Sequence, residues 1–403
     1  MKNSKNKKPG IVSVFTGAGG LDLGFLQAGF ELLCAIELAE WACDTLRLNH
    51  SSVPILGPPN SEGNLRALDD NEITEAAKRR GGSIDILIGG PPCQPFSQAA
   101  TQRFRRTDSR FKRRGFEDAK RGTLLLDFAH LIERLRPRAF VLENVPGLVS
   151  VDSGEQLAVV LGTLKDAGYS IAGPKLIEMA DYGVPQFRRR LFIWGSQTVG
   201  NPSFPEPSFS QTGNLLQRPF NVVVEALVGM PKDLPNHVPR DHKSESVARY
   251  RTLAFGQREH LGRVDRLDPR KPSKTIIAGG SNGGGRSHLH PFIARTLTVR
   301  ESARLQTFDD DFVFEGSSAR QFTQVGNAVP PLFAETLARH IMQEEFGVSN
   351  ASPYHFGQYL YHDEDVDMLV SRLWEESIQE KPEWIYFDSI PSSSQEEAGQ
   401  VAL

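Results

Sequence analysis

A cysteine with the surroundings of a nucleophile lies at Cys93, within residues 89–98 (GGPPCQPFSQ). The segment follows a short apolar run, residues 84–88, which is typical of a buried strand. A lone cysteine is most often a small buried hydrophobe, but Cys93 stands between prolines in a polar loop that precedes a basic run. Positive charge stabilises the thiolate, the nucleophilic form of cysteine. We therefore interpret Cys93 as a covalent nucleophile.

The basic run covers residues 103–121 and contains nine arginines and lysines against three acidic residues. The whole chain has a net charge of −3, so it is not basic throughout. Nucleic-acid binding depends on where the positive charge is concentrated. A solvated charged face is the common explanation of such a run, but its position directly after Cys93 favours contact with phosphates.

A glycine-rich turn, residues 15–20 (FTGAGG), lies between an expected strand at 11–15 and an expected helix at 21–28. Glu37 ends the next expected strand about 20 residues on, where an acid can take ribose hydroxyls. The pattern fits an adenosine-containing cofactor. Asp22 stands where a nicotinamide-binding fingerprint requires a small residue, which disfavours a dehydrogenase. Phe15 either lies against the adenine or sugar or is a core residue at the strand end.

With these segments the chain resembles the cytosine-5 DNA methyltransferases found in bacterial restriction–modification systems. Six segments match the family's motifs in the family's order, and they cover roughly residues 11–340. These segments are residues 15–20, 91–94 (PPCQ), 143–145 (ENV), 186–190 (QFRRR), 300–306 (RESARLQ) and 324–331 (QVGNAVPP). The chain departs from the family at Ser13, where an acid is usual, and at Asn64, where an aspartate is frequent.

The resemblance implies S-adenosylmethionine as the cofactor and double-stranded DNA as the substrate, and the spacing of cysteines and histidines indicates no metal site. It implies three sets of site residues. The catalytic residues are Cys93, Glu143, Arg188 and Arg190. The cofactor-binding residues are Phe15, Gly17, Gly19, Gly20, Glu37, Asn64, Pro92, Asn327 and Ala328. The DNA-binding residues are Gln94, Ser97, Arg103, Arg105, Arg106 and Gln186.

The chemistry of cytosine explains why these residue types are required. Carbon 5 is too electron-poor to attack a methyl group, and addition of the Cys93 thiolate to carbon 6 makes carbon 5 nucleophilic. Negative charge then develops on the ring, so a proton or hydrogen bond from Glu143 at N3 lowers the barrier. Arg188 and Arg190 alternate along an extended segment and point the same way. One is expected to hold the base carbonyl and orient Glu143, the other to contact a phosphate. The base must first be flipped out of the duplex.

Two other functions remain open at the level of sequence. The first is methylation of cytosine in tRNA, which one relative of the family performs; its catalytic motif typically continues Cys-Gln-Pro-Phe-Thr, whereas Ser97 follows Phe96 here. The second is a non-catalytic DNA-binding protein on the same scaffold. Such a protein is expected to have lost Cys93, Glu143 or the arginines, and all are present.

Alternating apolar runs and helical patterns predict an α/β fold with a doubly wound, mostly parallel sheet. We expect a catalytic and cofactor-binding domain at residues 1–195 plus 323–345, a target-recognition domain at 196–322, and an acidic but packed appendage at 346–403. Residues 300–306 are expected to support the recognition domain.

The 403 residues hold three cysteines without metal-ligand spacing and no apolar run of the length that spans a membrane. The first nine residues do not resemble a secretory signal. We expect a cytoplasmic monomer that shares its DNA site with a restriction endonuclease without forming a stable complex with it.

Overall fold

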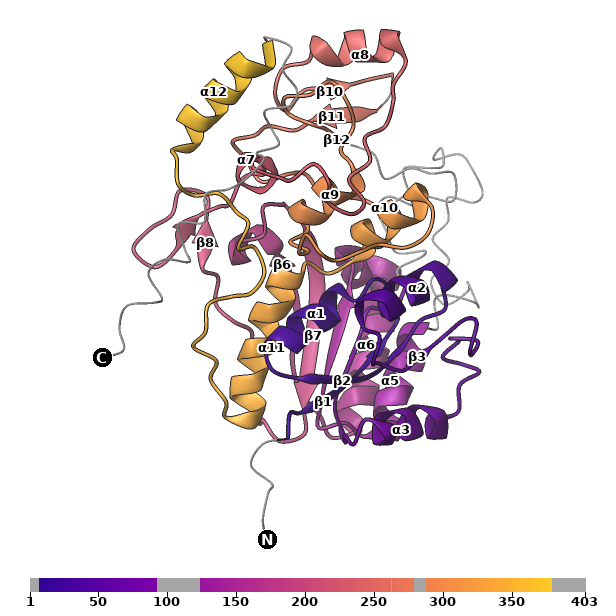
Figure 1. Ribbon diagram of the computed structural model, residues 1–403. Helices are drawn as coiled ribbons and strands as arrows, with labels where there is room; N and C mark the ends of the chain where they lie inside the picture. The colour runs from indigo at the N-terminus through magenta and orange to yellow at the C-terminus, as the bar shows by residue number, and fades with distance from the viewer. Residues whose placement is uncertain (1–6, 93–123, 262, 279–287, 379–403) are drawn as a thin grey trace, which may run out of the picture.

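The computed structural model describes residues 7–92, 124–261, 263–278 and 288–378, and its centre is a seven-stranded sheet (Figure 1). The strand order is β3-β2-β1-β4-β5-β7-β6. All neighbouring pairs from β3 to β5 are parallel, whereas β7 runs antiparallel to both β5 and β6. The strands are β1 (Gly10–Val14), β2 (Glu31–Ile36), β3 (Ile55–Leu56), β4 (Ile84–Gly89), β5 (Ala139–Asn144), β6 (Ser170–Glu178) and β7 (Arg189–Ser196).

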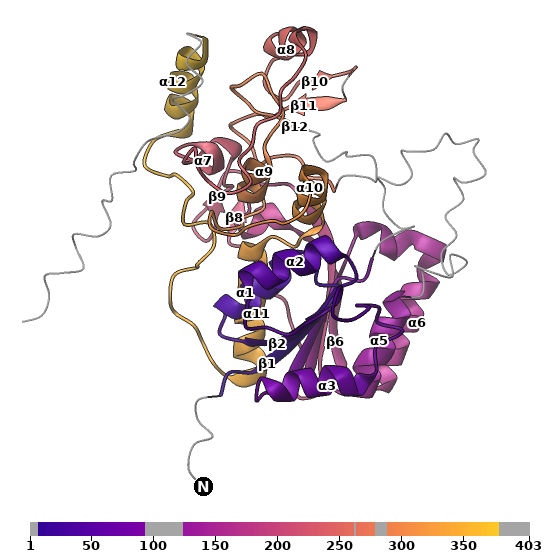
Figure 2. The same cartoon turned by 45° about the vertical axis from the view of Figure 1, so that its right-hand side comes forward.

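Helices cover both faces of this sheet, as Figure 2 shows. On one face, α1 and α11 pack over alternate strand residues that include Ile11, Ile86 and Val141. On the other face, α3, α5 and α6 pack over the intervening residues, including Val12, Leu87 and Leu142. Strands buried on both faces read as continuous apolar runs. The helices are α1 (Gly20–Gln27), α2 (Glu40–Asn49), α3 (Asp70–Arg79), α5 (Leu124–Leu135), α6 (Glu155–Asp166) and α11 (Pro331–Phe346).

A second, less regular lobe lies beyond one end of the sheet (Figure 1). Its core is a separate cluster in which Leu267, Leu297, Phe308 and Phe314 are buried. The elements of this lobe are β8 (Phe209–Ser210), β9 (Arg218–Pro219), α7 (Val223–Leu227), α8 (Ser244–Arg251), β10 (Arg258–Glu259), β11 (Val264–Arg266), β12 (His288–Leu289), α9 (Val299–Leu305) and α10 (Ser318–Asn327). Short 3-10 helices follow β5 at Pro146–Gly154 and β6 at Met179–Tyr182.

After α11 the chain returns to the second lobe and ends its described part with α12 (Val366–Ile378). Leu369, Val370 and Leu373 of α12 are buried against α7 and Phe292. Trp374 packs edge-on against Phe255, with 5.0 Å between ring centroids. Helix α12 thus packs against the second lobe through its apolar residues.

The predicted mostly parallel, doubly wound sheet is confirmed. Strand β6 was not predicted, because it is an edge strand with exposed positions that is interrupted by Gly173 and Pro174. The motif at residues 324–331 begins within the last turn of α10. Among the described residues, none of the helices has the length and apolar character needed to cross a bilayer.

Candidate active site

The predicted cofactor and catalytic segments follow strands whose carboxyl ends share one edge of the sheet. The glycine turn follows β1, Glu37 follows β2, Pro91 follows β4 and Glu143 lies near the end of β5. The chain order reverses between β1 and β4. In open parallel sheets this reversal leaves a crevice at the carboxyl ends of the strands, where ligands bind. The topology thus brings together residues that are more than 100 positions apart.

The glycine turn packs tightly against the segment after α10 at Gly20 and is open at Gly17. A Cβ on Gly20 would lie 2.3 Å from the carbonyl oxygen of Val329, so only glycine fits. Gly17 has φ +59°, and a Cβ there would meet no atom within 4 Å. Phe15 also has a left-handed φ of 56° and packs edge-on against Phe128. A ligand can therefore approach the backbone closely on the open face of the turn.

Glu37 binds this turn, and the residue before Asn64 packs against Glu37. The Glu37 carboxylate accepts hydrogen bonds from the backbone N–H groups of Gly17 at 2.7 Å and Ala39 at 2.8 Å. Burial raises the pKa of Glu37, although these N–H groups oppose the shift. Gly63, directly before Asn64, is pressed against the Glu37 backbone, since a Cβ there would lie 2.0 Å from the Glu37 carbonyl oxygen. This contact places Asn64 beside Glu37.

Asn327 and Ala328 reach the same turn from the end of α10. The Cβ of Ala328 lies 3.2 Å from the Cβ position of Gly20, and Asn327 is exposed next to it. The predicted cofactor residues before and after the second lobe in the sequence are thus adjacent in space. An open glycine turn, an acid held by backbone N–H groups and a neighbouring amide fit an adenosine-type cofactor.

Glu143 is buried and forms an ion pair with Arg190. The Nε of Arg190 lies 3.2 Å from Oε1 of Glu143, and the two side chains are 14% and 10% exposed. Burial raises the pKa of Glu143, while the charges of Arg190 and Arg188 act in the opposite direction. A carboxyl with a raised pKa is able to donate a proton or a hydrogen bond at pH values where an ordinary carboxyl is ionised.

The start of the predicted catalytic loop lies directly beside Glu143. Oε2 of Glu143 is 3.0 Å from the Cβ position of Gly90. Asn144 donates a hydrogen bond from Nδ2 to the carbonyl oxygen of Pro91, at 3.3 Å, and Pro92 is exposed. This role of Asn144 was not predicted, although its position directly after Glu143 in the same motif was the available signal. Cys93, Gln94, Ser97, Arg103, Arg105 and Arg106 lie outside the described residues.

The other two cysteines are poor nucleophiles. Cys34 and Cys43 are both fully buried, on β2 and α2. Burial raises the pKa of each thiol to about 12. Neither forms a thiolate at neutral pH, which leaves Cys93 as the candidate.

Arg188 occupies a position different from the one expected from sequence. It is completely buried, and its terminal nitrogens donate to the carbonyl oxygens of Ile276 at 3.1 Å, Gly326 at 2.9 Å and Ala328 at 2.9 Å. Because Arg188 is buried and bound to these carbonyl oxygens, the prediction that it contacts a base carbonyl or a phosphate is wrong for this structure. Arg188 joins β7 to the second lobe and to the segment that contacts Gly20.

Gln186 is likewise buried, so its expected DNA contact is wrong for this structure. Its Nε2 donates to the Leu305 carbonyl oxygen at 3.1 Å and to Oε1 of Gln306 at 3.0 Å. Its Oε1 accepts from the N–H of Ile276 at 2.9 Å. A pattern of alternating polar residues does not distinguish a DNA-facing side chain from one that satisfies buried backbone groups.

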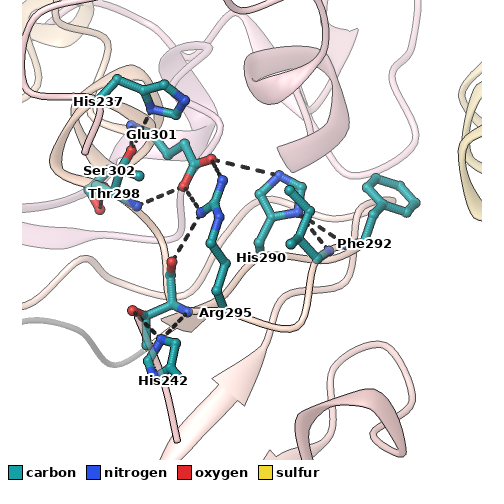
Figure 3. A network of polar contacts seen from close by, with 10 residues as sticks. His237, His242, His290, Phe292, Arg295, Thr298, Glu301 and Ser302 are labelled. Carbon is teal, nitrogen blue, oxygen red and sulfur yellow. Dashed lines mark hydrogen bonds and ion pairs between the residues drawn. The ribbon is translucent and has the colours of Figure 1, made fainter. Parts of the chain in front are cut away.

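Residues 300–306, which were expected to support the second lobe, bind backbone groups of that lobe. Arg300 donates to the carbonyl oxygens of Pro235, Asp309 and Phe312. Figure 3 shows the neighbouring carboxylate of Glu301, which accepts two hydrogen bonds from Arg295, at 2.8 and 2.7 Å, and one from the Thr298 N–H. Burial disfavours ionisation of Glu301, but the charge of Arg295 outweighs it and lowers the pKa to about 2.

Histidines surround this network without belonging to the catalytic edge. His290 is fully buried, and burial lowers its pKa to about 3, so it is neutral at physiological pH. His237 contacts Thr298 through Nδ1 at 2.9 Å. The network fixes the core of the second lobe, and its neutral histidines act as hydrogen-bonding groups.

The doubly wound sheet is that of an α/β enzyme, and its open glycine turn and buried acid–arginine pair suit an adenosine-type cofactor and a general acid. Residues 10–343 match the family model described as C-5 cytosine-specific DNA methylase. The chain therefore belongs to the C-5 cytosine-specific DNA methylase family and is a DNA (cytosine-5)-methyltransferase.

Curated relatives agree with this assignment. The Type II methyltransferase M.NgoFVII of Neisseria gonorrhoeae is 33% identical over 358 residues, which cover 84% of this chain and 88% of the relative. The Type II methyltransferase M1.HphI of Haemophilus parahaemolyticus is 32% identical, covering 82% of this chain and 86% of the relative.

Solved structures share the fold. A protein described as a DNA modification methyltransferase encoded within a prophage (E. coli) aligns with a TM-score of 0.64 and 24% identity, covering 83% of this chain and 99% of that one. The Dnmt2 methyltransferase of S. pombe aligns with a TM-score of 0.56 and 14% identity, covering 85% of this chain and all of that one.

Proposed function

We propose that this enzyme transfers a methyl group from S-adenosylmethionine to carbon 5 of a flipped cytosine in a specific double-stranded DNA site. Cys93 acts as the nucleophile at carbon 6. The observation that carries the proposal is the position of Glu143, buried, 3.2 Å from Arg190 and next to the first residues of the loop that contains Cys93.

The proposed roles follow from this geometry. The raised pKa of Glu143 favours its protonated form, which donates to N3 of the base as the Cys93 sulfur adds to the ring. Arg190 holds the carboxyl in one orientation through its ion pair and would also bind the base carbonyl. After methyl transfer, loss of the carbon 5 proton and of the Cys93 sulfur restores the aromatic ring.

The proposed cofactor site lies on the open face of the glycine turn. S-adenosylmethionine supplies an electrophilic methyl group on a cationic sulfur. Glu37 is suited to the ribose hydroxyls, Asn64 to the adenine, and the open side of Gly17 to close approach of the ligand. The residues proposed to hold the cofactor are Phe15, Gly17, Gly19, Gly20, Glu37, Asn64, Pro92, Asn327 and Ala328.

The proposed biological role is protection of DNA in a restriction–modification system, which the names of the Type II relatives support. The enzyme would act as a cytoplasmic monomer and share its site with an endonuclease that it does not bind stably. Recognition belongs to residues 196–322, and the catalytic domain comprises residues 1–195 and 323–345. Methylation mapping of genomic DNA from cells that express the chain should reveal one recurrent site.

Trapping with 5-fluorocytosine tests the covalent mechanism. Fluorine at carbon 5 cannot leave as a cation, so the adduct between Cys93 and the base should persist on a denaturing gel. It should require the methyl donor. Cys93→Ser should form no adduct. Cys34→Ala removes a buried thiol that is not ionised at neutral pH, so this variant should still form the adduct.

Absence of an adduct on DNA that contains the methylated site would refute the thiolate mechanism. The same assay with tRNA distinguishes the alternative substrate, and a wild-type protein that binds DNA without methylating it would support the non-catalytic alternative.

A further inference from the structure

Asp22 is a buried acid in the first turn of α1 whose charge is only partly satisfied. It is 1% exposed. Ser13 on β1 donates a hydrogen bond from Oγ to Oδ1 of Asp22 at 2.6 Å. The other oxygen, Oδ2, has no hydrogen-bond partner among the described residues. In the sequence, Asp22 disfavours a dehydrogenase but indicates no function of its own.

The carboxyl lies against the glycine turn that forms the proposed cofactor site. Oδ2 of Asp22 is 3.6 Å from the Cβ position of Gly19. Thr16 of the turn donates from Oγ1 to Ser13 Oγ at 3.1 Å and also contacts the carbonyl oxygen of Ile36 at 3.2 Å. A chain of contacts therefore runs from the turn through Ser13 to Asp22.

This arrangement costs the free protein stability. Burial raises the pKa of Asp22 to about 7, and the hydrogen bond from Ser13 only partly opposes that shift. An asparagine would fill the same space without the cost of burying a charge. Buried groups that are poorly satisfied in the free protein concentrate at functional sites, where a ligand compensates them.

We propose that Asp22 is a positioning residue that makes the cofactor site favour the cationic methyl donor over its neutral product. The proposal rests on the proposed function, because it takes the glycine turn as the cofactor site. S-adenosylmethionine and S-adenosylhomocysteine share the adenosine and the amino-acid group. They differ by one methyl group and by the positive charge on sulfur.

A nearby anion distinguishes these two ligands, whereas contacts with their shared parts do not. When the methyl group passes to cytosine, the sulfur becomes neutral, so its attraction to ionised Asp22 disappears together with the methyl. The product is then released more readily than the donor, and a fresh donor replaces it. The effect requires the ionised acid, so it grows as pH rises through about 7.

Other titratable groups lie on the elements that pack against the glycine turn and α1. They are Glu37 after β2, Cys43 on α2, and the Glu335–Arg339 ion pair on α11. Asp22→Asn leaves these groups unchanged, so their effects cancel when the ratio of the two dissociation constants is compared between variant and wild type. The ratio therefore isolates the charge at sulfur.

The proposal is tested by isothermal titration calorimetry on the full-length wild type and on Asp22→Asn. Each ligand is titrated alone at pH 5.5 and at pH 8.5. At pH 8.5 the dissociation constant of the product divided by that of the donor should be about tenfold larger in the wild type than in Asp22→Asn. At pH 5.5 the two proteins should give similar ratios. Asp44→Asn, at an exposed position of α2, should behave as the wild type at both pH values.

The wild type also tests the idea without any substitution, since its own ratio should rise with pH. A wild-type ratio that is the same at both pH values would refute the charge effect. So would equal loss of affinity for donor and product in Asp22→Asn, which is the result expected of a purely structural role. A wild type that binds neither ligand would refute the proposed cofactor site itself.

Discussion

Arg190 and Glu143 form an ion pair, with 3.2 Å between Nε and Oε1, although they come from antiparallel strands 47 positions apart in the chain. The pair places a buried carboxyl at the edge of the sheet where the glycine turn and the loop of Cys93 also begin. The carboxyl of Glu143 is held by Arg190, and burial makes it easier to protonate than an exposed glutamate.

Glu143→Gln should reduce kcat by about 10²- to 10⁴-fold, the usual contribution of a positioned general acid. Cofactor binding should be unchanged, because Glu143 is not at the glycine turn. In the wild type, the donor form of Glu143 is depleted as pH rises through its raised pKa, so kcat should fall on the alkaline side. The amide does not titrate, so this alkaline fall should be absent from the pH profile of the variant. An alkaline limb that is identical in both proteins would assign it to another group.

Arg190→Lys and Arg188→Lys should have contrasting effects. Lysine at 190 keeps a positive charge near Glu143 but lacks the fixed geometry of the guanidinium, so kcat should fall with little change in stability. The three N–H donors of a lysine at 188 lie on one nitrogen, so they do not replace two separate guanidinium nitrogens that bind three buried carbonyl oxygens. This change should lower the free energy of unfolding by roughly 3 kcal/mol. Urea denaturation and single-turnover kinetics separate the two outcomes, and similar denaturation midpoints would contradict the structural role of Arg188.

The sequence predicted the sheet and indicated the glycine turn after its first strand, because apolar periodicity and glycine positions are strong local patterns. Ile84–Gly89 and Leu124–Leu135 are apolar in the periods of a strand and a helix, and both elements are present. The roles of Gln186 and Arg188 were not predictable in this way. Their partners, including Ile276 and Gly326, lie about 90 to 140 positions away in an irregular lobe, where no periodicity indicates which backbone groups need donors.

The basic run should control DNA affinity through phosphates and not through sequence choice. Replacing Arg105 or Arg106 by glutamine should lower the slope of log affinity against log salt by about 1 for each phosphate that the variant no longer neutralises. The methylated sequence should be unchanged, because phosphate contacts carry no base information. Fluorescence anisotropy over a salt series measures the slope, and Arg79→Gln on α3 is a suitable control because this helix covers the sheet away from its carboxyl edge. A changed methylation site in either variant would indicate direct base contact.

Gly17→Ala and Gly81→Ala together test where the cofactor lies. Both glycines have a left-handed φ, +59° and +74°, and a Cβ at either would meet no atom within 4 Å in the free protein. Each substitution should therefore lower the free energy of unfolding by about the same amount, roughly 1 kcal/mol.

Only the Cβ at residue 17 would extend into the space assigned to the cofactor, because Gly81 follows α3 at the opposite end of the sheet, directly before the segment that enters β4. Gly17→Ala should weaken binding of S-adenosylmethionine by about tenfold or more, equivalent to about 1.4 kcal/mol, while Gly81→Ala should bind it as the wild type does. Calorimetric titration of both variants, with their melting temperatures as the check on folding, gives the comparison. Equal affinities at matched stability would mean that the ligand does not approach the open face of the turn.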